Sequence, residues 1–226
     1  MTRKFAAALV GLACLATPAA ASAEEGAERG KVQVKLLGTA VLPDGKITEF
    51  RTDIVGLPAN TQTEANDNVV PTVAIEYFFT DNVSVETICC FTQHDVDATT
   101  GLPGAELVSN ARVIPATLTA KYHFPVGGVK PYLGAGVTYF LWVKDKPGAD
   151  TIPLGVTDTD FSDEFGFVLQ GGIDIPVGGS GFGISLDAKK YFVDTTSRWF
   201  AGDIVAIETV HKLDPWVLSA GVAYRF

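Results

Sequence analysis

Apolar and polar residues alternate along much of the chain with a period of two, the spacing of strands that bury one face. Segments rich in Gly, Pro, Asp and Asn, which favour turns, interrupt this alternation. The stretches between the interruptions predict eight strands, at Lys31–Leu42, Val69–Phe79, Val83–His94, Arg112–Phe124, Val129–Val143, Glu164–Ile175, Gly181–Val193 and Asp214–Phe226. The chain after residue 23 is therefore expected to be all-β and to form one domain, 24–226.

The connections between the predicted strands alternate in length. Short turns lie at 80–82, 125–128 and 176–180. Long connections lie between them, at 43–68, 95–111, 144–163 and 194–213. Short turns on one rim, long loops on the other and an even number of strands are characteristic of outer-membrane barrels. We therefore predict an eight-stranded antiparallel transmembrane β-barrel with four long extracellular loops, short periplasmic turns and both termini in the periplasm.

The two faces of these strands differ in polarity. Apolar residues share one face of the last predicted strand: Trp216, Leu218, Ala220, Val222, Tyr224 and Phe226. The segments 73–79, 114–124 and 165–175 repeat this pattern. An apolar outside fits a membrane barrel, whereas a soluble barrel would need a polar outside. Aromatic residues at the strand ends, Tyr132 among them, are candidates for interfacial girdles.

The interior of an eight-stranded barrel has room for side chains or one small ligand. Charged side chains that point inward are expected to form a salt-bridged network, because unpaired charges are costly there. They are Glu86, Lys121, Asp174, Asp187, Lys189 and Arg225. Apolar side chains of inward parity would line a hydrophobic path: Phe78, Ile88, Phe140 and Trp142. Trp199 and Phe200, in the last long connection, are expected at its mouth.

The N-terminus predicts a signal peptide over residues 1–23. Arg3 and Lys4 precede an apolar core, and Ala21-Ser22-Ala23 has the small residues of a cleavage site. Lipoprotein processing at Cys14 is the weaker alternative, because Gly11 stands where a lipobox usually has Leu. Without Arg3 and Lys4, 15 of the 17 basic residues remain against 26 acidic ones. That balance repels nucleic acid, so no nucleic-acid partner is predicted.

The histidines bear on a possible enzyme. A barrel enzyme needs a His beside a nucleophile or a carboxylate near the outer rim. His94, His123 and His211 stand in no recognisable arrangement of that kind, although His94 or His211 would be the catalytic group if there were one. We therefore predict no catalytic residue, no enzyme activity and no cofactor.

Two further groups of residues have a plain interpretation. Four acidic residues at the end of the third long connection and the start of the next strand lack the EF-hand spacing and are read as solvated charges or as bridged to lipopolysaccharide through divalent cations. They are Asp158, Asp160, Asp163 and Glu164. Cys89 and Cys90 are read as small strand residues that face opposite sides. No resident metal is predicted.

Three runs of residues carry a resemblance. They are Phe79-Thr80-Asp81-Asn82-Val83 with Val85-Glu86, Lys130 to Tyr139, and Leu213 to Phe226. In this order and spacing they resemble the OmpW family of outer-membrane proteins, over essentially the whole mature chain except the long loops. The resemblance implies a hydrophobic lumen through which small hydrophobic solutes pass, with a sideways exit into the membrane.

The resemblance also implies partners. Tyr224 and Phe226 look like the C-terminal aromatic signal that the barrel-assembly machinery reads. Outer-membrane lipid and lipopolysaccharide would surround the barrel. The alternative function is a barrel that transports nothing and serves as a structural or stress-related component, or as a receptor for a phage or a bacteriocin.

Overall fold

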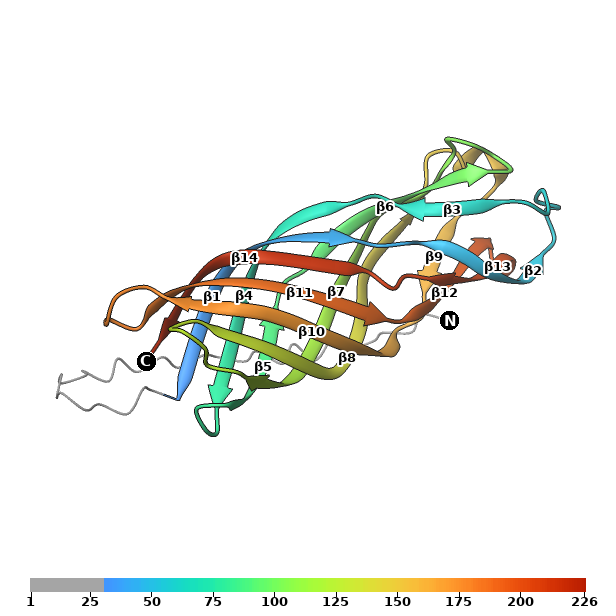
Figure 1. The fold of residues 1–226 in the computed structure, drawn as a ribbon. Coiled ribbons are helices and arrows are strands. Elements are labelled where there is room, and N and C mark those ends of the chain that lie inside the picture. Colours follow the sequence, from blue (N-terminus) through green and yellow to red (C-terminus); the bar gives the residue numbers. More distant parts are fainter. Residues whose placement is uncertain (1–30) are drawn as a thin grey trace.

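The computed structural model describes residues 31–226, so the expected signal peptide at 1–23 lies outside the described residues. Within this part, the chain forms fourteen strands and one short 3-10 helix, Ile152–Leu154. None of its helices is long and apolar enough to cross a membrane. The elements are arranged as an elongated barrel whose two ends differ (Figure 1).

Eight antiparallel strands close the barrel. They are β1 (Val32–Leu42), β4 (Asn68–Phe78), β5 (Val83–Cys89), β7 (Glu106–His123), β8 (Lys130–Pro147), β10 (Glu164–Pro176), β11 (Phe182–Phe192) and β14 (Trp216–Arg225). Their order around the wall is β7-β5-β4-β1-β14-β11-β10-β8, and β8 pairs with β7 to complete the circle. The first and last strands pair from Gln33↔Arg225 to Leu42↔Trp216. The predicted fold is confirmed.

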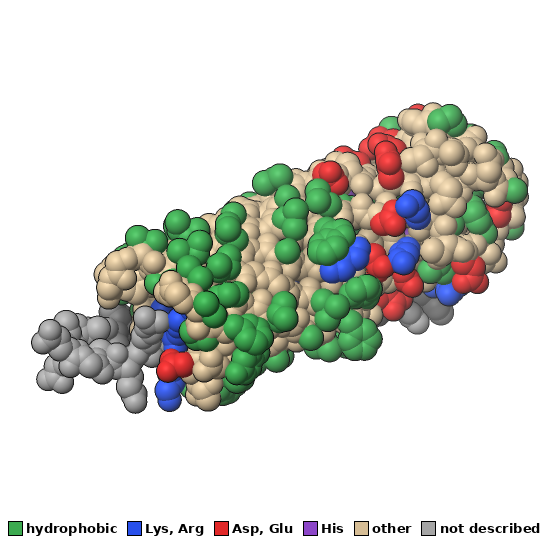
Figure 2. All heavy atoms as spheres, in the orientation of Figure 1, with side chains coloured by type: hydrophobic (Ala, Val, Ile, Leu, Met, Phe, Trp, Pro, Cys, Tyr) green, Lys and Arg blue, Asp and Glu red, His purple; other side chains and the backbone are tan. Residues whose placement is uncertain are grey.

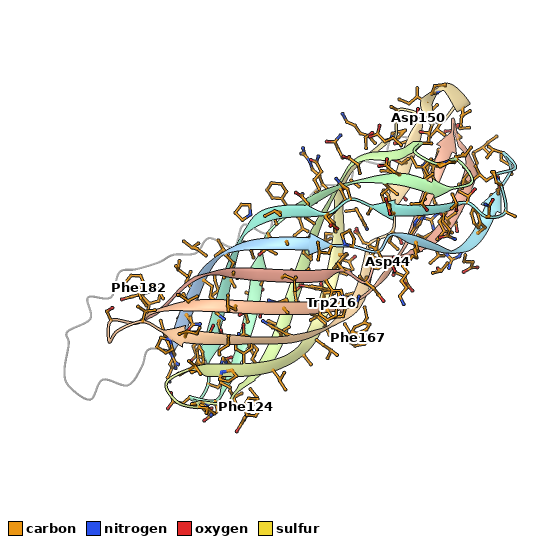
Figure 3. All side chains as sticks on the ribbon, turned by 45° about the horizontal axis from the view of Figure 1, so that its top comes forward. Asp44, Phe124, Asp150, Phe167, Phe182 and Trp216 are labelled. Atoms are coloured by element: carbon orange, nitrogen blue, oxygen red, sulfur yellow. The ribbon has the colours of Figure 1, made fainter. Side chains whose placement is uncertain are left out.

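The side chains face as the alternation predicted. On β7, Leu118 and Tyr122 are about half exposed, while Thr119 and Lys121 between them are buried. Apolar side chains cover the outside of the barrel over the half that holds the short turns (Figure 2). Phe124, Phe167, Phe182 and Trp216 lie on this outer surface (Figure 3). The apolar outside and the polar inside are those of a membrane barrel.

The long connections contain strands of their own. They are β2 (Lys46–Asp53), β3 (Gln62–Ala65), β6 (Thr92–Thr100), β9 (Asp158–Phe161), β12 (Asp194–Ala201) and β13 (Ile204–Lys212). β3 and β6 continue the barrel sheet through β7, and β2-β13-β12-β9 form a second sheet. We call these six strands and the adjoining ends of β7 and β8 the outer extension. It prolongs the barrel beyond the apolar belt, and its surface carries charges of both signs (Figures 1 and 2).

The predicted strand 83–94 is interrupted in the middle. β5 ends at Cys89 and β6 begins at Thr92. Pairing with β4 stops at Val73↔Cys89, and pairing with β7 stops at Thr117↔Ile88 and resumes at Val113↔Thr92. We call Cys90–Phe91 the strand break. At these two residues the chain pairs with neither β4 nor β7.

Two prolines account for the strand break. Phe78 donates its backbone N–H to the carbonyl of Lys31, just before β1, and His123 donates its N–H to the carbonyl of Asn82, just before β5. In an antiparallel strand, the backbone N–H groups of successive residues point alternately to the two neighbouring strands. Pro71 differs from Phe78 by an odd number of positions, so its backbone nitrogen points away from β1, toward the strand break. Pro115 differs from His123 by an even number, so its backbone nitrogen also points toward the strand break. Because proline has no N–H, neither neighbour can donate there.

Candidate functional site: an apolar cavity above a charge cluster

A cluster of buried ions fills the barrel on the short-turn side. Its members project inward from six strands and are Lys35, Glu76, Glu86, Lys121, Asp174, Asp187 and Lys189. Glu86 lies at its centre, where its carboxylate oxygens are 3.2 Å from Lys35 Nζ, 2.9 Å from Lys121 Nζ and 3.2 Å from Lys189 Nζ. These four side chains are 0–2% exposed. We call this set the charge cluster.

The charge cluster contains residues that sequence reasoning missed. Lys35 Nζ lies 3.0 Å from Glu76 Oε2 and 3.3 Å from Asp174 Oδ1. The parity of the first strand, in which Gln33, Lys35 and Thr39 are buried, would have revealed Lys35. Five of the six predicted network residues, all but Arg225, do meet here. Because water reaches almost none of these side chains, the charge cluster closes the barrel axis at this level.

Tyr132 corrects one expectation. It was expected in the girdle on the outside, but it is 2% exposed and points inward. Its hydroxyl donates to Asp187 Oδ2 at 2.7 Å, and Lys121 Nζ lies 3.7 Å from its ring centroid. Its ring occupies the space that a side chain at Gly172 would need. Tyr132 shares its parity with Phe140 on the same strand, so the alternation itself indicates the inward direction.

Phe78 and Arg225 lie together at the short-turn end, away from the positions expected for them. The guanidinium carbon of Arg225 is 3.8 Å from the Phe78 ring centroid, and its Nη2 lies 3.8 Å from Asp81 in the turn. Phe78 also lies 5.0 Å from the His123 ring. Phe78 is therefore buried beside the polar end of the barrel and does not line the apolar cavity described next. The alternation predicted correctly that Phe78 points inward, but it does not give the height of a side chain along the barrel axis.

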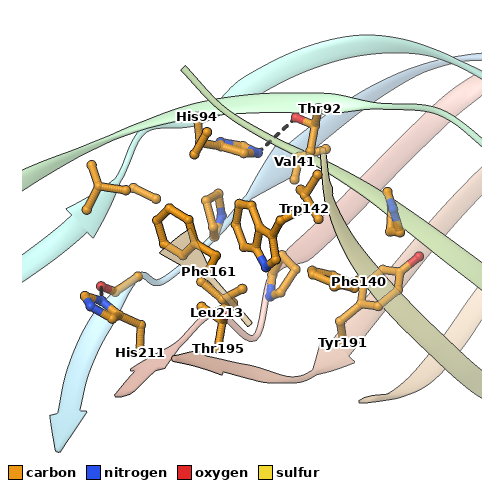
Figure 4. A pocket seen from close by; sticks show the side chains of 18 of the residues that line it. Val41, Thr92, His94, Phe140, Trp142, Phe161, Tyr191, Thr195, His211 and Leu213 are labelled. Carbon is orange, nitrogen blue, oxygen red and sulfur yellow. Dashed lines mark hydrogen bonds between the residues drawn. The ribbon is translucent and has the colours of Figure 1, made fainter. Parts of the chain in front are cut away.

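An apolar cavity lies between the charge cluster and the outer extension. Figure 4 shows side chains that line it, among them Phe140, Trp142 and Phe161. Ile88, Phe140 and Trp142 line it from the barrel strands, and Phe161 and Trp199 line it from the extension. Its free volume is about 60 Å³. That is room for roughly four to six waters, at about 10–15 Å³ each. Three of the four predicted path residues and one of the two predicted mouth residues thus meet in one cavity, while Phe200 is half-buried outside its lining.

Polar residues of the lining turn their polar atoms away from the cavity. His94 donates from Nδ1 to the Asn66 carbonyl at 2.6 Å and accepts at Nε2 from the Thr92 hydroxyl at 2.9 Å. His211 accepts at Nε2 from the Thr209 hydroxyl at 2.7 Å, and its Nδ1 donates to the Gly45 carbonyl at 3.2 Å. The wall that faces the cavity is therefore almost entirely carbon.

The same two histidines are held neutral. Burial lowers the pKa of His94, and burial lowers the pKa of His211 to about 4. Their hydrogen-bond partners among the described residues are hydroxyls and carbonyls, not a carboxylate. Neither histidine is therefore held by the carboxylate that orients the base in a Ser-His-Asp type of site.

A third histidine meets a serine and a glutamate without forming a catalytic triad. His123 Nε2 is 2.8 Å from Ser84 Oγ and 2.9 Å from Glu76 Oε1. A triad uses one ring nitrogen for the serine and the other for the carboxylate, whereas here both partners share Nε2. All three side chains are fully buried. They complete the packing around the charge cluster.

Aromatic side chains of the cavity lining connect the barrel strands to the outer extension. Trp142 stacks on Phe161 with ring centroids 4.5 Å apart, and it packs against both apolar clusters of the structure, one inside the barrel and one in the outer extension. Trp199 donates from its indole nitrogen to the Leu107 carbonyl at 3.2 Å, which ties β12 to β7. The outer extension thus forms part of the cavity wall.

The acidic residues at the end of the third long connection and the start of β10 form local contacts. Asp163 Oδ1 accepts the backbone N–H of Trp142 at 2.8 Å, Asp160 lies 3.5 Å from Arg198, and Glu164 accepts from Ser162 at 2.7 Å. Across residues 31–226, no group of three or more His, Cys, Asp or Glu is arranged to hold a metal ion. Cys90 is half-buried and lines the cavity.

A closed barrel with an apolar outside, an ion-filled interior and a long polar extension defines an outer-membrane β-barrel protein. The model of the OmpW family matches residues 28–226, and the chain therefore belongs to the OmpW family. The sequence is 36% identical to the uncharacterized outer-membrane protein y4mB of Sinorhizobium fredii, over 94% of this chain and 88% of that protein.

Solved structures share the fold. The crystal structure of OprG from Pseudomonas aeruginosa superposes with a TM-score of 0.78 at 21% identity and covers 89% of this chain and 98% of its own. The outer membrane protein AlkL, determined by solid-state NMR in lipid bilayers, gives a TM-score of 0.69 at 20% identity, over 93% and 96% of the two chains. The surroundings of such a barrel are outer-membrane lipid and lipopolysaccharide.

Proposed function

We propose that this barrel carries small hydrophobic molecules from its outer mouth into the membrane. The observation that carries the proposal is the carbon-walled cavity, closed toward the short turns by the charge cluster. An apolar solute gains roughly 25 cal/mol per Å² of apolar surface buried in such a cavity. Moving further along the axis, into the buried ions of the charge cluster, offers an apolar solute no favourable free energy. We therefore place the exit in the barrel wall and not at the short-turn end of the axis.

The strand break is the proposed exit. Cys90 lines the cavity, whereas Phe91, the next residue, is 63% exposed on the outer surface. One peptide unit thus joins the inside of the barrel to the side that meets lipid. Because Pro71 and Pro115 supply no N–H here, opening the wall breaks fewer hydrogen bonds than at any fully laddered position.

The orientation and assembly belong to the same proposal. The short turns and both termini of the mature chain face the periplasm, and the outer extension faces the medium. The segment 1–23 directs export. Tyr224 and Phe226 pack edge to face at 4.7 Å beside the end of β14, where the barrel-assembly machinery would read them.

Tracer uptake tests the route to the cavity. We expect liposomes that carry the folded barrel to take up a medium-chain alkane faster than empty liposomes do. Phe140→Asp and Trp142→Asp should abolish the gain, because each places a charge in the cavity, whereas Phe140→Leu should keep most of it. No acceleration by a barrel shown to be folded would overturn the proposal and leave a structural or receptor barrel as the better account.

The exit has its own test. Pro71→Ala combined with Pro115→Ala restores two backbone donors, so the wall should close and tracer uptake should fall several-fold. Saturable binding of the tracer to the cavity should persist. Pro131→Ala, at the short-turn end of β8, is the matched control and should leave uptake unchanged. Equal uptake by the double variant and the native chain would place the exit elsewhere.

A further inference from the structure

Two polar groups in the cavity lining have no hydrogen-bond partner among the described residues. They are the indole Nε1 of Trp142 and the hydroxyl Oγ of Ser197. Both atoms are buried, and Ser197 as a whole is 1% exposed. A buried donor without a partner costs about 1–3 kcal/mol, and most buried polar groups avoid that cost.

The contrast with neighbouring residues makes these two groups distinctive. Trp199, the other lining tryptophan, uses its indole N–H on the Leu107 carbonyl. Thr195, the other hydroxyl residue that β12 adds to the lining, donates to the Ser162 carbonyl at 3.0 Å. His94 and His211 are likewise satisfied. The two groups without partners belong to β8 and β12, on two different sheets, and both residues line the cavity.

We infer that the preferred solute is an apolar chain with one small uncharged polar head, such as a hydroxyl or an ether oxygen, which Trp142 and Ser197 bind. This inference rests on the proposed function and names the substrate class of the same cavity. The Trp142 N–H donates to an oxygen of the head, and the Ser197 hydroxyl donates to it or accepts from it. The apolar chain lies along the carbon wall beside Phe140 and Ile88.

The size of the cavity explains how the head reaches these groups. A free volume of about 60 Å³ is too small for a six-carbon chain with the side chains as they stand. A solute must therefore part Trp142 from its neighbours, and that movement uncovers the two polar atoms. A pure alkane would open the cavity and leave both without a partner, whereas a solute with a polar head supplies one. A charged head would not fit, because the carbon wall offers it no counter-ion.

The experiment compares three probes of equal chain length: n-hexane, 1-hexanol and hexyl methyl ether. Their saturable binding is measured on the full chain in lipid nanodiscs, with empty nanodiscs subtracted to remove partition into lipid. For the native barrel we expect hexanol and the ether to bind several-fold more tightly than hexane. Trp142→Phe keeps a ring but removes the N–H, and should lower the preference for both over hexane by about three- to tenfold.

Ser197→Ala should act more on hexanol than on the ether, because the ether cannot donate a hydrogen bond. The matched controls are Trp199→Phe and Thr195→Val, whose polar atoms are already paired within the protein. They weaken the binding of all three probes together and leave the preference between the probes unchanged.

A preference that is unchanged in both Trp142→Phe and Ser197→Ala would overturn the inference, as would equal binding of hexane and hexanol by the native barrel. In that case saturable hexane binding would still support the apolar route. Binding of hexanol without hexane would support the inference and reject a route for pure alkanes. Absence of saturable binding for all three probes would reject both.

Discussion

The lumen has two halves that are built from the same strands and differ in chemistry. In the short-turn half, β1, β4, β5, β7, β10 and β11 point lysines and carboxylates at one another. In the outer half, the same wall points Ile88, Phe140 and Trp142 into a carbon-lined space. The change takes place within single strands, for example on β5 between Glu86 and Ile88.

This difference assigns separate tasks to the two halves. Buried ions in contact with several partners are rigid, because any movement leaves a charge without compensation. An apolar wall exchanges one dispersion contact for another at small cost, so it can accept a solute. The charge cluster therefore acts as a fixed floor and the cavity as an adaptable chamber. The predictions below alter one half at a time.

The largest effect is expected in the charge cluster. Lys35→Met leaves Glu76, Glu86 and Asp174 with one cation fewer, and breaking a buried ion network from one side costs about 3–5 kcal/mol. We expect a loss near the upper end, about 5 kcal/mol, in urea unfolding from lipid vesicles. Lys46→Met, at an exposed pair with Asp44, should change the free energy of unfolding by less than about 1 kcal/mol. Similar losses for the two variants would contradict the idea of a rigid floor.

Phe140→Ala enlarges the chamber and should cost about 4 kcal/mol of unfolding free energy, as large-to-small changes in cores do. We expect the free energy of unfolding to fall while transport is kept. Because the wall stays apolar, the variant should admit bulkier tracers than the native barrel does, measured by uptake into liposomes. Reduced uptake of small and bulky tracers alike would mean that Phe140 supports the wall and does not limit its volume.

The outer half should also respond to pH. Burial lowers the pKa of His211 to about 4, against about 6.5 in an unfolded chain. Between these values the unfolded chain binds more protons, so the native state loses stability as pH falls from about 6.5 to about 4 and no further below that. A shift of this size corresponds to roughly 3 kcal/mol. His211→Gln should remove that part of the pH slope, and an unchanged slope would show that other groups produce it.

The smallest effect is expected at the closure of the outer extension. Trp199→Phe removes the hydrogen bond to the Leu107 carbonyl, worth about 1 kcal/mol, while the ring stays in place. Hydrogen exchange should become faster for the amides of β12 and β13 and stay unchanged for those of β1 and β14. Equal acceleration on all four strands would mean that the extension does not open separately from the barrel.

Sequence reasoning reached the barrel because its main signal is local. Alternation along 114–124 and 165–175 states which side chains face lipid, whatever the neighbouring strand is. The long connections were predicted as loops because they are rich in turn-forming residues. The structure instead has strands there, such as Asp194–Ala201, which contains Thr and aromatic residues. Sequence reasoning also merged β5 and β6, although Pro71 and Pro115 on the neighbouring strands were visible in the sequence.

The sequence by itself determined the number of strands in the barrel wall, their outward and inward faces and the presence of both ions and aromatics inside. Only the tertiary structure decided which of these meet. Gln33 and Asp174 bond across the barrel although 141 positions separate them, and Phe78 and Phe140, which both point inward, lie at different levels of the lumen. The physical reason is that a period of two fixes the direction of a side chain, whereas the stagger of each strand against its neighbour fixes its height in the barrel.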